Sequence, residues 1–294
     1  MNFSELEKKL QANRVPLIIC MPEDQEAILA AQEAMEMGYV DCVFVGNRAR
    51  ITELVKQVAK NFEPEIVDAE GEEDAAAKSV ALIRSGRGKA LMKGTIATPK
   101  LLKAVLNSEN GIKAGDVLSH VLVYEWEGRF KYLTDGGMVP HPTLAEKQAI
   151  LANAVDLARR LGDAKPKVAV LSALETVNLK MPSTVDAAVL AKMGERKQFG
   201  SCQVEGPLAL DNAISVESAH HKGLHGDVVG QADILVCPDI DTGNVLGKSL
   251  MYFANVPAGG LIVGAKVPII LLSRADSKQT RLNSIKLALA SGLN

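Results

Sequence analysis

Residues 16–46, PLIICMPEDQEAILAAQEAMEMGYVDCVFVG, combine two short apolar runs with one amphipathic stretch. The runs Pro16–Met21 and Val40–Val45 have the length and composition of buried strands. Between them, Glu23–Met37 has small and apolar residues at helical spacing. Its inward face is predicted to consist of Ala27, Ile28, Ala31, Ala34 and Met35. A strand, a helix and a second strand of these lengths are typical of parallel pairing with a right-handed crossover.

The same alternation extends along most of the chain in both directions. Further strands are expected at Glu65–Val67, Lys89–Met92, Lys167–Leu171, Ser201–Val204, Ile234–Cys237, Leu261–Val263 and Ile269–Leu272. Further helices are expected at Arg48–Lys60, Asp74–Ser85, from about Pro99, and at Ser183–Met193, Asp211–His221, Gly243–Phe253 and Ser277–Ser291. This pattern predicts an α/β fold.

One segment interrupts the rhythm. Leu118–Glu125 and Phe130–Thr134 flank Gly128 and predict a β-hairpin. A helix is expected next, at Thr143–Leu161, where Thr143 and Glu146 have capping-box spacing. The interruption favours two closely packed lobes with a boundary near 135–142.

The composition excludes several classes of protein. The chain has 294 residues, a net charge of −2 and 4% aromatic residues, which argues against nucleic acid as a partner. No apolar run is long enough to cross a bilayer, and Met1–Leu10 lacks the apolar core of a signal peptide. The four cysteines are far apart, as in a reduced protein, so a cytoplasmic location is expected.

Polar loops follow several of the expected strands, where open α/β sheets bind ligands. These loops are Lys93-Gly94-Thr95, Thr134-Asp135-Gly136-Gly137, Glu205-Gly206-Pro207, Pro238–Asn244 and Ser273–Ser277. In the last loop, Arg274 stands at a strand exit before a helix, and both its guanidinium and the helix amides suit phosphate. Ser273 is placed to hydrogen-bond a thiol or carbonyl, and Asp276 to accept a proton. Ordinary helix capping with a surface Arg–Asp pair is an equally good reading of the spacing alone.

Other motifs point away from common cofactor sites. Gly243–Ser249 resembles a nucleotide-binding P-loop but has Thr242 where the first glycine is required, so a nucleoside triphosphatase is rejected. Asn244 and Lys248 remain candidate donors to another phosphorylated ligand. The pair His221 and His225 lacks further metal ligands, and a solvated helix end is favoured over a metal site.

Seven blocks, in this order, resemble phosphate acetyl- and butyryltransferases, most closely the butyryl or branched-chain type. They are LMKGTIATPKLLKAVLN (91–107), LSHVLVYE (118–125), TDGGMVPHPTLAEKQAILANAV (134–155), LETVNLKMPSTVDAAVLAKM (174–193), VEGPLALDNAIS (204–215), ADILVCPDIDTGNVLGKSLMYFA (232–254) and GAKVPIILLSRADS (264–277). They span nearly the whole chain. Together they are far more specific than any single motif.

The resemblance implies a two-lobed α/β subunit with the isocitrate and isopropylmalate dehydrogenase fold, a cleft between the lobes, and a homodimer. The first lobe is expected to comprise residues 1–138 and 265–294, and the second lobe residues 139–264. The implied reaction converts acyl-CoA and phosphate into acyl phosphate and CoA, on butyryl or branched short-chain acyl groups. CoA is a substrate, and neither a metal nor another cofactor is expected.

The resemblance also implies site residues. Ser273 and Arg274 match the pair that contacts the CoA thiol and phosphate in acetyl-transferring relatives. The basic aspartate of those relatives, seven residues after the serine, is Thr280 here, so Asp276 is the substitute candidate. Gly247 replaces the usual tyrosine. The predicted substrate-binding residues are Lys93, Gly94, Thr95, Asp135, Gly206, Pro207, Asp239, Gly243, Asn244 and Lys248.

Three alternatives stay open at this point. One is a phosphate acetyltransferase, and another is a non-catalytic relative that binds CoA or acyl phosphate. The third is a dehydrogenase of the related fold, which would require a cluster of acidic metal ligands.

Overall fold

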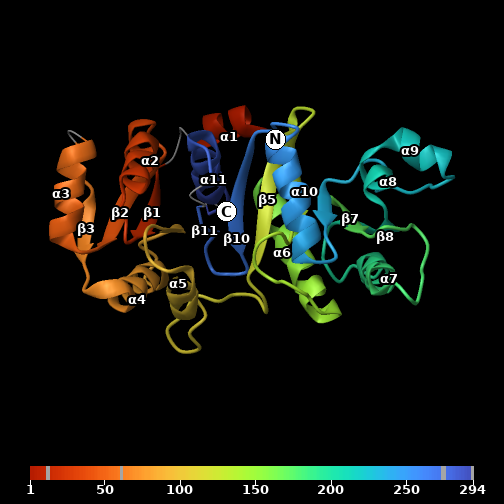
Figure 1. The fold of residues 1–294 in the computed structure, drawn as a ribbon, viewed down its shortest axis with the longest axis horizontal. Coiled ribbons are helices and arrows are strands. Elements are labelled where there is room, and N and C mark those ends of the chain that lie inside the picture. The colour runs from red at the N-terminus through yellow and green to blue at the C-terminus, as the bar shows by residue number, and fades with distance from the viewer. Residues whose placement is uncertain (11–13, 60–61, 273–275, 293–294) are drawn as a thin grey trace. The chain divides into compact units, whose positions relative to one another are not determined.

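The computed structural model describes residues 1–10, 14–59, 62–272 and 276–292. The chain divides into two compact units, and Figure 1 labels their elements. Unit 1 comprises Met1–Asn2 and Gly115–Ala258, and unit 2 comprises Phe3–Ala114 and Gly259–Asn294. Within the described ranges, no helix is long and apolar enough to cross a membrane.

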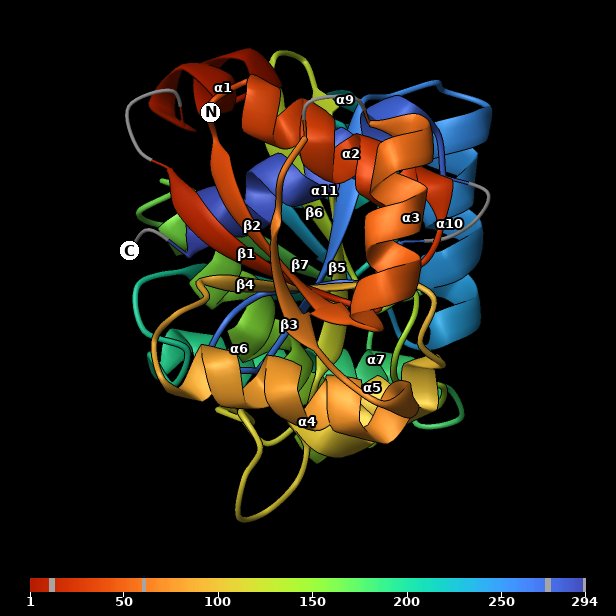
Figure 2. The same cartoon turned by 90° about the vertical axis from the view of Figure 1, so that its left-hand side faces the viewer.

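Unit 2 is a mostly parallel sheet with helices on both faces. Its strands, in spatial order, are β3 (Glu65–Asp68), β2 (Val40–Gly46), β1 (Val15–Cys20), β4 (Ala90–Lys93), β11 (Ile269–Ile270) and β10 (Ala258–Val263). Its helices are α1 (Phe3–Leu10), α2 (Gln25–Glu36), α3 (Arg48–Val58), α4 (Gly71–Arg84), α5 (Thr98–Val105) and α11 (Lys278–Ser291). Figure 2 shows α2, α3 and α11 on one side of the strands, and α4 and α5 on the other. All neighbouring strands pair in parallel except β10 and β11.

The order of connections in unit 2 creates a switch point beside β1. The chain passes from β1 through α2 to β2 on one side, and later returns through α4 to β4 on the other side. Helix α2 follows β1 and helix α5 follows β4, on opposite sides of the strands (Figure 2), so the two helices diverge at the carboxyl ends of β1 and β4. In open α/β sheets such a divergence is the usual ligand position.

Unit 1 contains the predicted hairpin and a parallel extension. Its strands, in spatial order, are β5 (Ser119–Trp126), β6 (Arg129–Thr134), β9 (Ile234–Val236), β7 (Lys167–Leu171) and β8 (Gln203–Leu208). Its helices are α6 (Leu144–Arg160), α7 (Pro182–Glu195), α8 (Leu210–Ile214), α9 (Val216–His221) and α10 (Ile240–Tyr252). The turn between β5 and β6 has positive φ at Glu127 and Gly128, as the twist of a tight hairpin requires.

Alternating residues along strands of unit 1 pack into two apolar layers, one on each face of the sheet. Ala169 and Leu171 of β7, with Leu235 of β9, belong to the core that α8, α9 and α10 cover. The intervening Val170 faces the other way, toward the small Gly206 and Ala187 of α7. This period-2 pattern buries both faces of the sheet.

The predicted elements are present, with two local differences in unit 1. The helix expected at Asp211–His221 is two helices that meet at Ser215, whose hydroxyl caps α9. Strand β8 continues through Gly206 and Pro207, which had been placed in a loop. Proline is tolerated there because β8 lies at the edge of the strand order.

The division into units also differs from the expected lobe boundaries. The hairpin was assigned to the first lobe, but it groups with residues 139–258 in unit 1. The physical reason is that β6 pairs in parallel with β9 from Tyr132 to Thr134. Met1 joins the same unit, where its carbonyl accepts a hydrogen bond from the Phe130 amide at 2.7 Å.

Candidate active site

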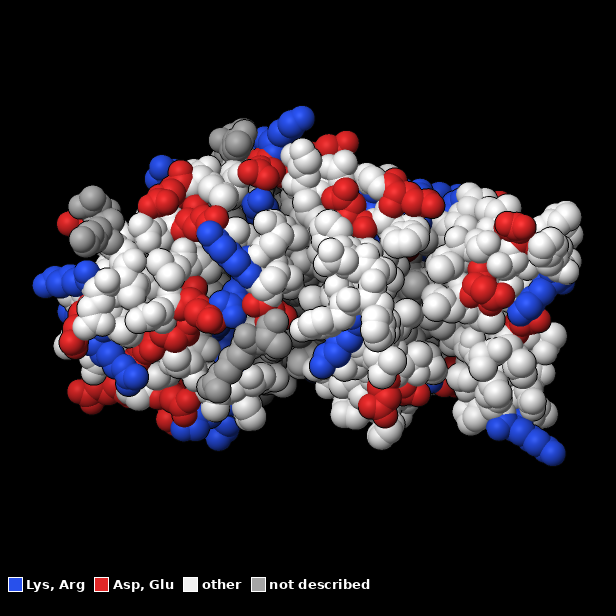
Figure 3. Space-filling model, turned by 45° about the horizontal axis from the view of Figure 1, so that its top comes forward, with Lys and Arg blue, Asp and Glu red and all other residues white. Residues whose placement is uncertain are grey.

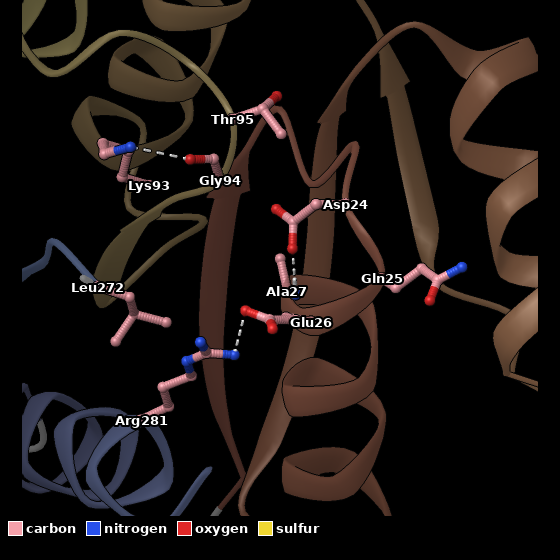
Figure 4. A pocket seen from close by; sticks show the side chains of 9 residues that line it. All are labelled: Asp24, Gln25, Glu26, Ala27, Lys93, Gly94, Thr95, Leu272 and Arg281. Carbon is pink, nitrogen blue, oxygen red and sulfur yellow. Dashed lines mark hydrogen bonds and ion pairs between the residues drawn. The ribbon is translucent and has the colours of Figure 1, made fainter. Parts of the chain in front are cut away.

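A pocket of about 420 Å³ lies in unit 2 at the carboxyl ends of β1, β4 and β11 (Figure 4). Its lining residues come from the entry to α2, the exit of β4, the exit of β11 and one turn of α11. They are Asp24, Gln25, Glu26, Ala27, Lys93, Gly94, Thr95, Leu272 and Arg281. The pocket therefore occupies the switch point of unit 2, and it includes the predicted residues Lys93, Gly94 and Thr95.

Backbone contacts hold the β4 exit against the β1 exit. The Gly94 amide donates to the Cys20 carbonyl and the Thr95 amide to the Met21 carbonyl, both at 2.8 Å. The Thr95 hydroxyl also donates to the Met21 carbonyl, at 3.1 Å. A Cβ atom on Gly94 would lie 2.0 Å from that same oxygen. Only glycine permits this close approach of the two backbones. Gly94 is therefore required by the fold, whether or not it also contacts a ligand.

Two cationic side chains face the pocket. The Lys93 ammonium donates to the carbonyls of Gly94 and Ile96, at 3.0 and 3.1 Å. These two carbonyls help to fix the position of the ammonium group. Arg281 reaches in from α11 and forms an ion pair with Glu26, with Nη1 and Oε2 2.5 Å apart. Figure 4 shows Leu272 between Lys93 and Arg281.

Arg281 and Glu26 were not singled out from the sequence. The available signal was an arginine one turn into the helix that follows the Ser273–Ser277 loop. Its acidic partner lies on α2, far away in the chain, and nothing in a single sequence pairs the two.

Two of the three predicted catalytic residues, Ser273 and Arg274, lie outside the described residues. Leu272, directly before them, lines the pocket. Asp276 is half-buried and precedes Ser277, whose hydroxyl caps α11 by accepting the Thr280 amide at 3.1 Å. The Thr280 hydroxyl lies 2.9 Å from the same oxygen. The position that carries the basic aspartate in acetyl-transferring relatives thus takes part in a helix cap here.

Unit 1 has a second polar cluster at the carboxyl end of β6. The buried Asp135 carboxylate accepts hydrogen bonds from the amides of Gly137 at 2.8 Å, Met138 at 3.0 Å and Val139 at 3.2 Å. Burial raises the pKa of Asp135, although those amides and the charge of His120 oppose the shift. His120 lies across the hairpin and was not predicted. This carboxylate shapes its loop and is poorly placed to attract an anion.

The Asp135 loop is fixed to the start of α10. A Cβ atom on Gly243 would lie 2.3 Å from the Asp135 carbonyl oxygen, so the two backbones touch. The Asn244 side chain donates to the Gly136 carbonyl at 3.0 Å. Three predicted residues, Asp135, Gly243 and Asn244, are therefore brought together.

Asp239 begins α10 by accepting the Thr242 amide at 2.8 Å. Burial alone would raise the pKa of Asp239, but its hydrogen bonds to Thr242 and the charges of His141 and Lys147 lower it overall. Lys147 is buried and forms an ion pair with Asp186 at 2.8 Å. It was missed because it sits inside an amphipathic helix, where lysine normally faces solvent.

The remaining predicted residues have other surroundings. Gly206 lies so close to Val170 that a Cβ atom would be 2.9 Å from the Val170 carbonyl, and Pro207 is buried beside it in β8. Lys248 is exposed in the interior of α10. Because 243–249 are helical, they do not form a loop that wraps phosphate. Gly247 faces the sheet, where a Cβ atom would meet Leu122 at 3.2 Å.

Neither thiol nor metal chemistry is visible among the described residues. Burial raises the pKa of Cys20 to about 11 and that of Cys237 to about 12, so both thiols stay protonated at neutral pH. In the described ranges, no group of three or more His, Cys, Asp or Glu side chains is placed to hold a metal ion. His220 and His221 are exposed at the end of α9.

Comparison with known proteins assigns the family. The family model described as "Phosphate acetyl/butaryl transferase" matches residues 52–289. The chain is 40% identical over 291 residues to a phosphate butyryltransferase of Clostridium acetobutylicum, covering 98% of this chain and 97% of that protein. It is 43% identical over 274 residues to a phosphate acetyltransferase of Rhizobium meliloti, covering 92% of this chain and 87% of that protein.

Solved structures agree with this assignment and confirm the fold. A branched-chain phosphotransacylase from Enterococcus faecalis has a TM-score of 0.83 and 35% identity, covering 95% of this chain and 99% of its own. A putative 4-hydroxythreonine-4-phosphate dehydrogenase from Salmonella typhimurium has a TM-score of 0.59 at 15% identity, covering 95% of this chain and 100% of its own, and shows the expected dehydrogenase-like fold. The chain therefore belongs to the phosphate acetyl- and butyryltransferase family of acyltransferases.

Proposed function

We propose that the protein catalyses acyl-CoA + phosphate = acyl phosphate + CoA. The observation that carries this proposal is the pocket at the switch point of unit 2, in a chain of this family. Lys93 there presents a fixed cation, and Leu272, which also lines the pocket, directly precedes Ser273 and Arg274 in the sequence. Cations are needed because negative charge grows on the phosphate as the acyl–oxygen bond breaks.

In the direction of acyl-CoA synthesis, a base removes the proton of the CoA thiol, and the thiolate attacks the carbonyl of the acyl phosphate. A thiolate is required because the neutral thiol is a poor nucleophile. Arg274 holds the departing phosphate and Ser273 orients the thiol or the carbonyl oxygen, as the resemblance implies. Asp276 is the proposed base, since Thr280 cannot serve. CoA acts as a substrate, and the protein carries no further cofactor in this mechanism.

The proposed acyl group is butyryl or a branched short chain. Support comes from the similarity to the butyryltransferase of Clostridium acetobutylicum and the branched-chain phosphotransacylase of Enterococcus faecalis. Acetyl is the second candidate, because the Rhizobium meliloti acetyltransferase is similar at 43% identity. Initial rates across acetyl-, butyryl- and isovaleryl-CoA distinguish the two.

The test of the reaction is release of free thiol from each acyl-CoA in the presence of phosphate. No thiol release with any of these substrates would overturn the proposal. Arg274→Ala should raise the apparent KM for phosphate about tenfold or more, since a charge-assisted contact is lost. The exposed Lys192, on α7, supplies the matched control Lys192→Met, which should leave the phosphate KM unchanged.

We further propose a homodimer in which α8, α9 and α10 of unit 1 form the contact. These helices expose apolar side chains, among them Ile214, Val216, Val245, Tyr252 and the 91% exposed Phe253. In Figure 3 the surface over α10 carries few charged side chains. Exposed apolar side chains of this kind mark protein contacts where they gather into a patch.

Sedimentation of Phe253→Ser with Val245→Ser should shift the protein toward monomer. Leu29→Ser, in unit 2, is the control because Leu29 is also an exposed apolar residue. A monomeric wild type would refute the dimer. The proposed partners are otherwise acyl-CoA, phosphate and acyl phosphate rather than nucleic acid, consistent with the net charge of −2. The substrates and the four unpaired cysteines support a cytoplasmic location.

A further inference from the structure

Arg281 is the second cation of the unit 2 pocket, and the proposed reaction leaves it without a role. Its side chain is 12% exposed and comes from α11, whereas Lys93 comes from the end of β4. Two cations from different elements that face one cavity are an arrangement suited to a dianion. Arg281 also carries the planar donor fork that matches phosphate oxygens in a bidentate fashion.

Glu26, one partner of Arg281, is poorly retained by its surroundings. Glu26 lies in the first turn of α2, and its side chain is 63% exposed. A carboxylate so open to water keeps most of its hydration when it leaves the guanidinium, and exposed ion pairs contribute little net free energy. The neighbouring Asp24 is engaged as the α2 cap, accepting the Ala27 amide at 2.8 Å. Glu26 is therefore the acidic side chain in this pocket that an incoming anion can displace.

We propose that Arg281 and Lys93 form a phosphate-binding subsite in which an incoming phosphate group displaces Glu26 from Arg281. This inference rests on the proposed acyl transfer and names a further residue for it. The exchange replaces one exposed carboxylate contact of Arg281 by a phosphate held in the pocket that Lys93 also lines. Glu26 acts as an internal competitor that lowers phosphate affinity and keeps Arg281 oriented when the pocket is empty.

Two sources can supply the phosphate group: inorganic phosphate, together with the acyl phosphate made from it, and the phosphate ester of CoA. Direct binding of inorganic phosphate is measured by calorimetry in the absence of acyl-CoA, so the readout does not depend on turnover. Binding of CoA is measured beside binding of dephospho-CoA, which lacks the 3′-phosphate.

The variants are Arg281→Met, Arg281→Lys and Glu26→Gln. Arg281→Met should weaken binding of inorganic phosphate about tenfold, and Arg281→Lys should weaken it less, because the charge remains but the fork is lost. Glu26→Gln should tighten phosphate binding about threefold, because the competing charge is gone. If the Arg281–Glu26 pair only held α2 against α11, both Arg281→Met and Glu26→Gln would weaken phosphate binding. Tighter binding in Glu26→Gln is therefore not expected from a purely structural pair.

The matched control is Lys278→Met. Lys278 on α11 pairs with Glu33 on α2 at 2.9 Å, so it links the same two helices but does not line the pocket. It should leave phosphate binding unchanged. If Lys278→Met weakens phosphate binding as much as Arg281→Met, the effect is helix docking and the proposal is overturned.

The remaining outcomes are also decisive. If Arg281→Met weakens CoA but neither dephospho-CoA nor inorganic phosphate, the subsite exists and takes the CoA phosphate. If no ligand changes affinity, or if Glu26→Gln weakens phosphate, the proposal fails. Should Arg281→Met not fold, Arg281→Lys and Glu26→Gln still decide. Wild-type phosphate binding without acyl transfer would instead refute the proposed function and leave this subsite standing.

Discussion

In unit 1 the carboxyl end of β6 leads into Asp135, whereas in unit 2 the carboxyl end of β4 is Lys93. Both positions rely on a glycine that lets two backbones touch: Gly243 against Asp135, and Gly94 against Met21. The side chains then differ in sign. The Asp135 carboxylate accepts hydrogen bonds from amides of its own loop, whereas the side chains of Lys93 and Arg281 line a pocket. The carboxyl ends of two strands, each held by a close glycine contact, thus carry a carboxylate that organises its loop in one unit and a cation that lines a pocket in the other.

The largest expected effect comes from Gly94→Ala. The added Cβ atom would lie 2.0 Å from a backbone oxygen that cannot move aside, so we expect a loss of about 3 kcal/mol in the free energy of unfolding. Acyl transfer should fall about 100-fold because Lys93 and Thr95 are displaced. Urea unfolding and thiol release measure both effects. Gly247→Ala is the control, since its Cβ atom meets only side-chain ends at 3.2 Å or more. Equal losses in the two variants would contradict the close-approach argument.

Asp135→Asn tests the unit 1 half of the comparison. The new amide nitrogen must face at least one of the backbone N–H groups that now donate to the carboxylate, so we expect a loss of about 2 kcal/mol in stability. Phosphate binding should be unaffected, because the Asp135 carboxylate accepts hydrogen bonds from the amides of its own loop. Chemical unfolding and calorimetry give the two values. A large change in phosphate affinity would show that the two sites are not electrostatically separate.

A smaller difference in stability is expected between the helix caps that follow the two sites. Thr143 caps α6 within a capping box and also donates to Glu146 at 2.8 Å, whereas Ser277 caps α11 alone. Thr143→Ala should cost about 1.5 kcal/mol and Ser277→Ala about 1 kcal/mol of stability. Thermal unfolding of both variants checks the order. The reverse order would mean that the Ser277 cap has a role beyond α11.

The smallest effect is the pH dependence of one carboxylate in each unit. Hydrogen bonds from Tyr39, then Lys286, lower the pKa of Glu7 in unit 2, and burial raises the pKa of Asp135 in unit 1. The Glu7 contribution is present above its unfolded pKa and lost as pH falls through the lower folded value. The Asp135 contribution is present below its unfolded pKa and lost as pH rises through the higher folded value. Unfolding free energies at several pH values from about 3 to 7 should therefore shift with opposite slopes in Glu7→Gln and Asp135→Asn. Parallel slopes would refute one of the two assignments.

The sequence predicted the alternation of strands and helices because the apolar periods are clear, and the caps at Thr143 and Ser277 are confirmed. The start of α10 was misplaced because Gly243 looks like a helix entry, while the actual cap is Asp239. Lys93, Gly94 and Thr95, which line the pocket, could be proposed from the sequence because a strand exit is a local feature. Arg281 with Glu26, and Lys147 with Asp186, were missed because each pair joins two helices that only the fold brings together.

The place of β11 has a consequence for the order in which the chain folds during synthesis. Residues 3–114 are made first, but Leu91 and Met92 of β4 pair with Ile269 and Ile270, which are made only after the whole of unit 1. Until then β4 presents an open edge, which invites association with other chains. Unit 1, by contrast, is nearly continuous in the chain from Gly115 to Ala258. Leu272 and Arg281, which line the unit 2 pocket, are therefore made only after the whole of unit 1.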